Sequence, residues 1–103
     1  MKKTKKHELI DARQMAAKHP DTFQVPTATE IDNIMIGWLC KVATSEERFW
    51  VLVTEKKPIG EISGEYSFKG KIENEVDTQG LKFGDEIEFY SCNIYEIDDD
   101  LPF

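Results

Sequence analysis

The side chains best suited to nucleophilic or metal chemistry are few and widely spaced in this chain of 103 residues. His7 and His19 lie near the two ends of a predicted helix, whereas Cys40 and Cys92 lie within strand-like patterns. A metal site would need carboxylates from elsewhere, and a cysteine or serine nucleophile needs a histidine base beside it. The sequence therefore predicts no catalytic residue, no metal site and no cofactor, and we expect that the protein is not an enzyme.

Carboxylates are abundant, but several have the pattern of exposed strand residues. Glu61, Glu65, Glu73 and Glu75 share one parity, and mostly apolar residues occupy the other. Acid–base catalysis by paired carboxylates needs one group with a raised pKa in a shielded pocket. Side chains on the solvent-facing side of a strand are not in a shielded pocket, so we expect these four glutamates to be surface charges.

Charge is unevenly distributed along the chain. The net charge is −7, yet four lysines, Lys2, Lys3, Lys5 and Lys6, lie within the first six residues. Residues 61–103 hold 12 acidic residues against three lysines, a net charge of −9. Such a surface repels nucleic acid and anionic membranes and complements basic proteins. The charge serves solubility alone, or it forms a face for a basic protein partner.

For the second alternative, we predict a partner surface that combines outward carboxylates with two aromatic side chains. Trp is favoured at interface hot spots, although core packing is the alternative for Trp38. Tyr90 falls on the water side of its predicted strand. The predicted partner-binding residues are Glu61, Glu65, Glu73, Glu75, Glu86, Glu88, Asp98, Asp99, Asp100, Trp38 and Tyr90.

The basic N-terminus does not have the pattern of a secretory signal. His7, Glu8 and Asp11 follow the lysines, and no apolar run of the required length is present. No window of the sequence approaches membrane-spanning length. Two cysteines are too few for a disulfide framework. We therefore expect a cytoplasmic protein, with no membrane contact, in which both cysteines are reduced core residues.

One helix is predicted before the first strand. Residues 5–18 are helix formers without Gly or Pro, and Thr4 is available as the N-cap. The apolar stripe is narrow, so this helix must dock on the rest of the protein to be stable. Leu9 and Ile10 are the expected docking residues, with Met15 as a further candidate.

The strand pattern begins with a hairpin. Residues 48–53 form the longest apolar run and predict a central strand covered on both faces. A polar turn separates them from residues 38–43, so the two stretches predict an antiparallel hairpin. Residues 61–76 then alternate with period two and should bend or break near Gly64 or Gly70.

The remaining chain predicts strands at residues 86–90 and 91–97. Together these elements predict an α+β fold, with an N-terminal helix docked on a mainly antiparallel sheet of about five or six strands. The expected sheet is strongly bent and forms a partial β-barrel. Residues 1–103 should form a single domain, with residues 1–4 and 98–103 as flexible ends.

Five short motifs, taken in order, resemble the YegJ-like bacterial domain family of unknown function. The chain departs from that family at Trp38, where members often have Asp, and at Val76, where they often have Pro. The resemblance implies a small sheet-based module, found in toxin-immunity neighbourhoods, without an established activity. The matching residues are Phe23 and Pro26; Gly37, Cys40, Lys41 and Val42; Arg48, Phe49, Trp50, Val51, Val53 and Thr54; Gly70, Ile72 and Asn74; and Leu81, Gly84, Asp85, Ile87, Phe89, Asn93 and Ile94.

Three polar residues within these motifs, Arg48, Asn74 and Asp85, are the candidates for a pocket. Asn74 has the core-facing parity, and a buried Asn must find hydrogen-bond partners. The structural alternative is that Asp85 caps the Gly84 turn, Asn74 ties down a neighbouring loop and Arg48 pairs with a carboxylate.

Three functions are therefore open. The first is a small acidic, non-enzymatic binding protein that inhibits or neutralises a protein partner, as an immunity protein or a phage-borne inhibitor does. The second is a small-ligand-binding or hydrolytic domain built around Arg48, Asn74 and Asp85. The third is homo-oligomerisation through an exposed strand edge.

Overall fold

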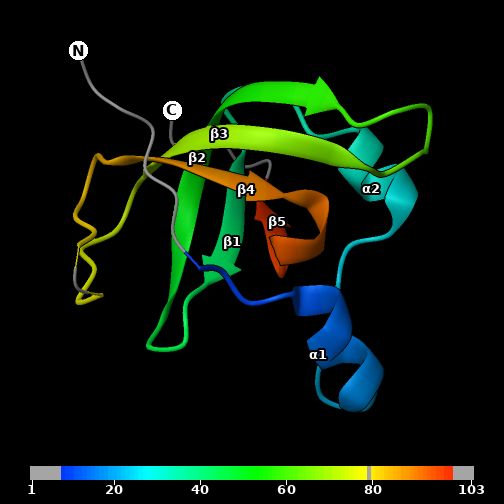
Figure 1. The fold of residues 1–103 in the computed structure, drawn as a ribbon, viewed down its shortest axis with the longest axis horizontal. Helices are drawn as coiled ribbons and strands as arrows, with labels where there is room; N and C mark the ends of the chain where they lie inside the picture. The colour runs from blue at the N-terminus through cyan, green and yellow to red at the C-terminus, as the bar shows by residue number, and fades with distance from the viewer. Residues whose placement is uncertain (1–7, 79, 99–103) are drawn as a thin grey trace.

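The computed structural model describes residues 8–78 and 80–98, which form one sheet and two short helices (Figure 1). The expectations for Thr4, residues 1–4 and residues 99–103 lie outside the described residues. The elements are α1 (Ala12–Lys18), α2 (Ala28–Asp32), β1 (Leu39–Ala43), β2 (Arg48–Pro58), β3 (Tyr66–Ile72), β4 (Glu86–Tyr90), the 3-10 helix η1 (Ser91–Asn93) and β5 (Glu96–Asp98).

The five strands form a single antiparallel sheet in the order β4-β3-β2-β1-β5. The predicted hairpin is confirmed, because β1 and β2 pair from Ala43 opposite Arg48 to Leu39 opposite Leu52. The α+β class and the antiparallel sheet are also confirmed. Among the described residues β4 and β5 are the two edges, so the sheet is not closed into a barrel. The predicted partial barrel and strong bend are not confirmed.

Strand β2 is central, but only one of its faces is buried. Phe49, Val51 and Val53 are almost inaccessible to solvent, whereas Trp50 between them is half-buried. The ammonium of Lys41 lies 4.8 Å from the centre of the Trp50 ring. The expectation that both faces are covered is therefore wrong, because a neighbouring lysine lies over Trp50 where a second apolar layer was expected.

Gly64 lets the chain turn before β3, and Gly70 allows β3 to pair closely with β2. The chain turns at Gly64, whose φ of +79° lies in the left-handed region. The predicted break is thus confirmed there, and Ile62 before it is 71% exposed although its parity predicted burial. Within β3 the parity holds, since Phe68 is buried. At Gly70 a Cβ would lie 2.4 Å from the carbonyl oxygen of Leu52, so this position requires glycine.

Helix α1 begins later than predicted. Its N-cap is Asp11, whose carboxylate accepts a hydrogen bond from the Gln14 N–H at 3.0 Å. Residues 8–11 are not helical. The predicted start was wrong because the residues that continue the helical pattern upstream are held against the sheet instead.

The contacts of Leu9 and Ile10 explain that shift. The Ile10 N–H donates to the Ala43 carbonyl at 2.8 Å, beside the end of β1. Leu9 packs against the main core, and Ile10 packs against a smaller cluster formed by Ala12, Ala43 and Tyr95. Leu9 and Ile10 therefore pack on apolar clusters as predicted, but they precede α1, so the predicted docking of the helix through these two residues is not confirmed.

The predicted strand at residues 91–97 is wrong over its first half. Residues 91–93 form η1, where the Asn93 side chain accepts a hydrogen bond from the Tyr90 N–H at 2.9 Å. The last strand is β5, which pairs with β1. Cys40 and Cys92 are both free thiols, but only Cys40 is a core residue, and burial raises its pKa to about 12. Cys92 lies half-buried in η1.

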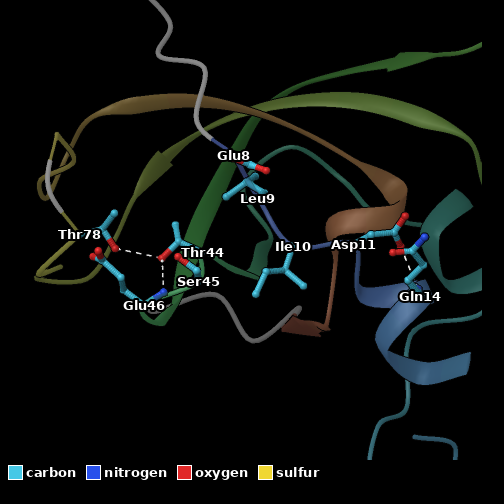
Figure 2. A pocket seen from close by; sticks show the side chains of 9 residues that line it. All are labelled: Glu8, Leu9, Ile10, Asp11, Gln14, Thr44, Ser45, Glu46 and Thr78. Atoms are coloured by element: carbon cyan, nitrogen blue, oxygen red, sulfur yellow. Dashed lines mark hydrogen bonds between the residues drawn. The ribbon is translucent and has the colours of Figure 1, made fainter. Parts of the chain in front are cut away.

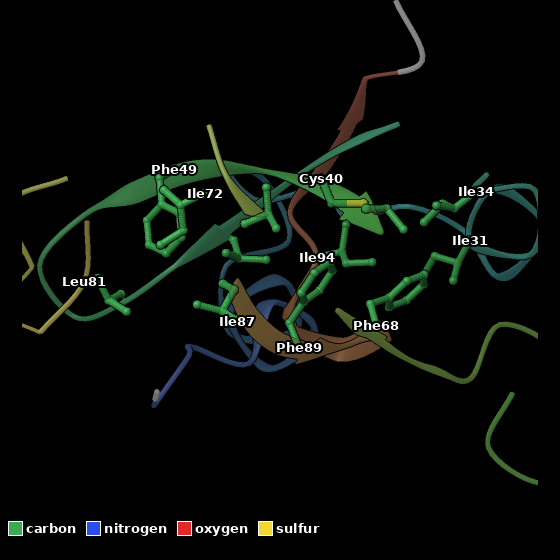
Figure 3. Packing of buried hydrophobic residues seen from close by; sticks show 13 residues of the cluster. Ile31, Ile34, Cys40, Phe49, Phe68, Ile72, Leu81, Ile87, Phe89 and Ile94 are labelled. Carbon is green, nitrogen blue, oxygen red and sulfur yellow. The ribbon is translucent and has the colours of Figure 1, made fainter. Parts of the chain in front are cut away.

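The main core lies against the inward face of the sheet, and Figure 3 shows its side chains. The rings of Phe68 and Phe89 stack with their centres 5.1 Å apart. Ile31, in α2, and Ile34, just after it, reach the same cluster, so α2 is attached to the core by its apolar side. The buried members are Ile31, Ile34, Cys40, Val42, Phe49, Val51, Val53, Phe68, Ile72, Leu81, Ile87, Phe89 and Ile94.

Candidate functional site

A pocket of about 580 Å³ lies where the segment before α1 meets the turn between β1 and β2 (Figure 2). Nine described residues line it; three of these nine carry carboxylates, and none of them is lysine or arginine. Two aliphatic side chains, three hydroxyl groups and the amide of Gln14 complete the described wall. The lining residues are Glu8, Leu9, Ile10, Asp11, Gln14, Thr44, Ser45, Glu46 and Thr78.

Two buried threonines hold one wall of this pocket together. The hydroxyls of Thr44 and Thr78 lie 3.1 Å apart and share a hydrogen bond. The Thr44 hydroxyl also accepts from the Glu46 N–H at 3.2 Å, as Figure 2 shows. The two threonines are only 4% and 5% exposed. They therefore fix the β1–β2 turn against the loop between β3 and β4.

Glu47, which lies in the same turn as Thr44, strengthens the connection to the loop between β3 and β4. Its carboxylate accepts hydrogen bonds from the Asp77 N–H at 2.7 Å and from both the N–H and the hydroxyl of Thr78. The hydrogen bond from the Thr78 hydroxyl is the main reason that the pKa of Glu47 lies below its ordinary value. Glu47 is thus a charged residue with a structural role.

Further carboxylates lie in the β1–β2 turn and in the loop between β3 and β4, which Glu47 and Thr78 connect. The Glu73 N–H donates to the Trp50 carbonyl at 3.0 Å, so the β3–β4 loop runs beside the start of β2 and the turn before it. The carboxylates of this region are exposed except for the half-buried Asp11 and Glu47. We call this region the acidic end, and it consists of Glu8, Asp11, Glu46, Glu47, Glu73, Glu75 and Asp77.

The predicted partner carboxylates do not form one surface in the described residues. Glu61 lies before β3 and Glu73 and Glu75 lie after it, so they occupy opposite ends of that strand. Glu65 is bound to Arg13. Asp98 lies on the edge strand β5, and Asp99 and Asp100 lie outside the described residues.

Two of the predicted carboxylates face lysines across the sheet. Glu86 and Glu88 of β4 lie opposite Lys71 and Lys69 of β3, respectively. Cross-strand pairs of opposite charge stabilise a sheet modestly. Each of these carboxylates therefore has a lysine opposite it in the sheet register, although the Lys69 ammonium also lies 3.6 Å from a carboxylate oxygen of Glu55.

The predicted aromatic contacts occupy separate places. Trp38 is half-buried, packs against the main core and lines a second pocket, of about 290 Å³, with Glu30, Asn33 and Ile97. Tyr90 is 44% exposed at the end of β4. Neither side chain lines the pocket of the acidic end.

Arg48, Asn74 and Asp85 each have their own contacts. The guanidinium of Arg48 lies 4.8 Å from the centre of the Tyr95 ring. The Asn74 side-chain oxygen accepts from the Trp50 N–H at 2.6 Å. The Asp85 carboxylate accepts from the Lys82 N–H at 3.0 Å, within the turn that contains Gly84. None of the three lines the pocket of the acidic end.

A second polar group, absent from the sequence-based expectations, surrounds the end of α2. Asp32 accepts hydrogen bonds from the Ser63 hydroxyl, from the Gly64 N–H at 2.7 Å and from the Tyr66 hydroxyl at 2.8 Å. The hydrogen bond from Ser63 contributes most to lowering the pKa of Asp32. We call this group, together with Lys56, the α2 cluster.

Lys56 supplies the cation of the α2 cluster. Its ammonium donates to the carbonyls of Ile31, Asp32 and Ile34 at 3.2, 2.7 and 2.9 Å, which satisfies the C-terminal end of α2. It also lies 4.2 Å from the centre of the Tyr66 ring. Burial lowers the pKa of Lys56, and the nearby Asp32 opposes that shift.

Sequence analysis missed the pocket because its residues come from three distant segments. The turns at residues 44–47 and 77–80 were recognisable, but nothing in their composition pairs one with the other. Glu47 and Thr78 are 31 positions apart. Nothing in the local sequence indicated that Thr78 is buried.

The chain matches no protein-family model, no curated protein and no solved structure. The resemblance to the YegJ-like family therefore stays a prediction. No helix in the described part of the chain has the length and apolarity needed to cross a membrane. The described residues also contain no group of three or more His, Cys, Asp or Glu placed to hold a metal ion.

Proposed function

We propose that the protein is a small acidic binding protein that engages a basic protein partner through the acidic end and thereby inhibits or neutralises it. The observation that carries the proposal is the pocket whose described lining residues include Glu8, Asp11 and Glu46 and no lysine or arginine. A cation from outside the lining would balance these charges. The partner would supply it.

The lining fits a lysine or arginine side chain of that partner. Long basic side chains bury their methylene stems along apolar surface while the charged head stays near polar groups. Leu9 and Ile10 offer the apolar surface, and Glu8 and Glu46 offer the carboxylates. The rigid connection between Thr44 and Thr78 keeps the wall in place before binding, which lowers the entropic cost of association.

The net charge of −7 supports the same proposal at longer range. Complementary fields raise the association rate of two proteins and weaken as salt screens them. The charge also disfavours nucleic acid as the ligand. A cytoplasmic location and kinship with the YegJ-like domains belong to this proposal.

Calorimetric titration with a blocked hexalysine peptide tests the proposal. The substitutions Glu8→Lys and Glu46→Lys, made together, should weaken binding by about tenfold or more, since like charges then face the peptide. The control pair is Asp21→Lys with Glu61→Lys, which changes the net charge equally but lies outside the acidic end. It should weaken binding much less.

Two results would contradict the proposal. One is an equal loss of affinity in both double variants, which would mean that only the net charge matters. The other is the absence of salt-dependent binding by the unmodified protein. Urea unfolding of each variant provides the check that the fold is unchanged.

A further inference from the structure

Residues 10–25, which we call the strap, are anchored to the main core on both sides. Leu9, directly before them, packs against that core, and Ile31, a short way after them, is one of its buried members. In Figure 1, α1 lies below the strands and projects away from them. All five strands lie outside residues 10–25. The sheet can therefore stay paired when the strap leaves it.

The apolar contacts within the strap belong to the smaller cluster, which is separate from the main core. Ala12 is the buried residue of α1, and it packs with Ala43 and Tyr95. Phe23 and Val25 are only partly buried beside them. Burying an alanine stabilises a protein much less than burying the phenylalanine and isoleucine side chains of the main core. The strap is therefore held more weakly than the strands are.

Polar contacts hold the first half of the strap. The Asn93 side chain donates to the Ile10 carbonyl at 3.1 Å, beside the hydrogen bond from the Ile10 N–H to Ala43. Arg13 forms an ion pair with Glu65. The side chains of that pair are 37% and 33% exposed. Because water competes for such a pair, it contributes little to holding the strap closed.

Arg48 attaches the second half of the strap. Its guanidinium lies 5.2 Å from the centre of the Phe23 ring and 4.8 Å from the centre of the Tyr95 ring. Phe23 belongs to the strap, whereas Tyr95 directly precedes β5. The exposed Arg48 therefore joins the strap to the sheet through two cation–π contacts, which are modest in strength at an exposed site.

The length of α1 indicates how the strap would open. The helix has seven residues, and a helix of that length is unstable in water on its own. Once the strap leaves the sheet, α1 therefore unfolds with it. Release also restores backbone freedom to every strap residue, which offsets part of the lost contact energy.

We infer that the strap opens as one unit while the sheet and the main core stay folded. Ile10, Asp11 and Gln14 of the strap line the pocket of the acidic end, so opening removes one wall of that pocket. A ligand that needs this wall binds the closed form alone and shifts the population toward it. Opening itself needs no ligand, so it is independent of the proposed partner.

Native-state amide exchange of the full chain, without ligand, tests the inference. The strap amides are those of Met15 and His19, which donate to the carbonyls of Asp11 and Met15, respectively. The sheet amides are those of Val53 and Ile72, which are also hydrogen-bonded to backbone carbonyls. We expect protection factors about 100-fold lower for the strap amides than for the sheet amides.

Two substitutions separate opening of the strap from unfolding of the whole protein. Arg48→Gln removes the cation beside Phe23 and should lower the protection of both strap amides by about threefold. The control is Ile87→Val, because Ile87 is fully buried in the main core. It should lower the protection of the sheet amides by about fivefold. It should leave the strap amides unchanged, since Ile87 stays buried when the strap opens.

Three results would overturn the inference. Equal protection of strap and sheet amides would mean that the strap is released only when the whole protein unfolds. An equal loss of protection at both sets of amides in Ile87→Val would mean the same. A response to Arg48→Gln at only one of the two strap amides would show that the strap frays in parts and does not open as one unit.

Discussion

Two groups of carboxylates at opposite ends of β3 differ in how their charge is balanced. At the start of the strand, Asp32 accepts three side-chain or backbone donors and lies near Lys56, while Glu65 is bound to Arg13. Near the other end of the strand, the described hydrogen-bond donors to Glu47 of the β1–β2 turn are all neutral. Carboxylates therefore stabilise the fold at both ends, and at the second end Glu8 and Glu46 also line the pocket.

The difference follows from the cations that each end can reach. Lys56 comes from β2 and is directed at the end of α2, so the charge and the helix carbonyls satisfy each other. No lysine or arginine is among the described residues that line the pocket of the acidic end. Carboxylates without a balancing cation repel one another and make an exposed surface that favours a basic ligand.

Removing the cation of the α2 cluster should produce the largest change in stability. Lys56→Met removes the donor that the carbonyls of Ile31, Asp32 and Ile34 share, and among the described residues only Ile31 keeps a backbone donor, the Ile34 N–H, so the free energy of unfolding should fall by about 2 kcal/mol. The control is Lys57→Met, whose side chain is 66% exposed, and it should change stability by less than about 0.5 kcal/mol. Urea unfolding measures both variants. Equal stabilities would contradict a structural role for Lys56.

Substitution of Glu47 should change the free energy of unfolding less than Lys56→Met does, and the size of the change should depend on pH. The folded pKa of Glu47 lies below its ordinary value of 4.5, so the unfolded chain binds the proton more readily. Glu47 therefore stabilises the protein above that pH, and this contribution disappears as the pH falls through the folded pKa. Glu47→Gln should flatten the acid limb of a plot of stability against pH.

The matched control for this experiment is Glu46→Gln, which removes a neighbouring exposed carboxylate. Stability measured by urea unfolding across the acid range should keep the steep limb in that variant. An equally flattened limb in both variants would mean that the hydrogen bonds from Asp77 and Thr78 contribute nothing specific to the charged form of Glu47.

Local patterns predicted the centre of the sheet well. Alternation identified Phe68, Ile87 and Phe89 as core residues, and the polar turn before Arg48 indicated the hairpin. A bend or break was predicted near Gly64 or Gly70, and the chain turns at Gly64. These features depend on neighbours in sequence, since parity and turn chemistry are local properties.

Features that depend on distant contacts could not be predicted. Leu9 and Ile10 fit a helical stripe, but a hydrogen bond to Ala43 and packing on two apolar clusters hold them outside the helix. The pocket joins Glu8 to Thr78 across most of the chain. Tertiary contacts override local propensity in both cases.

The most direct test of the central claim is an amide-shift titration of the unmodified protein with blocked hexalysine. The account predicts saturable, salt-sensitive shifts at Thr44, Ser45, Glu46 and Thr78, with residues 59–65 beside the α2 cluster unaffected. Shifts centred on residues 59–65, or spread evenly over all acidic residues, would contradict the assignment of the acidic end as the binding surface.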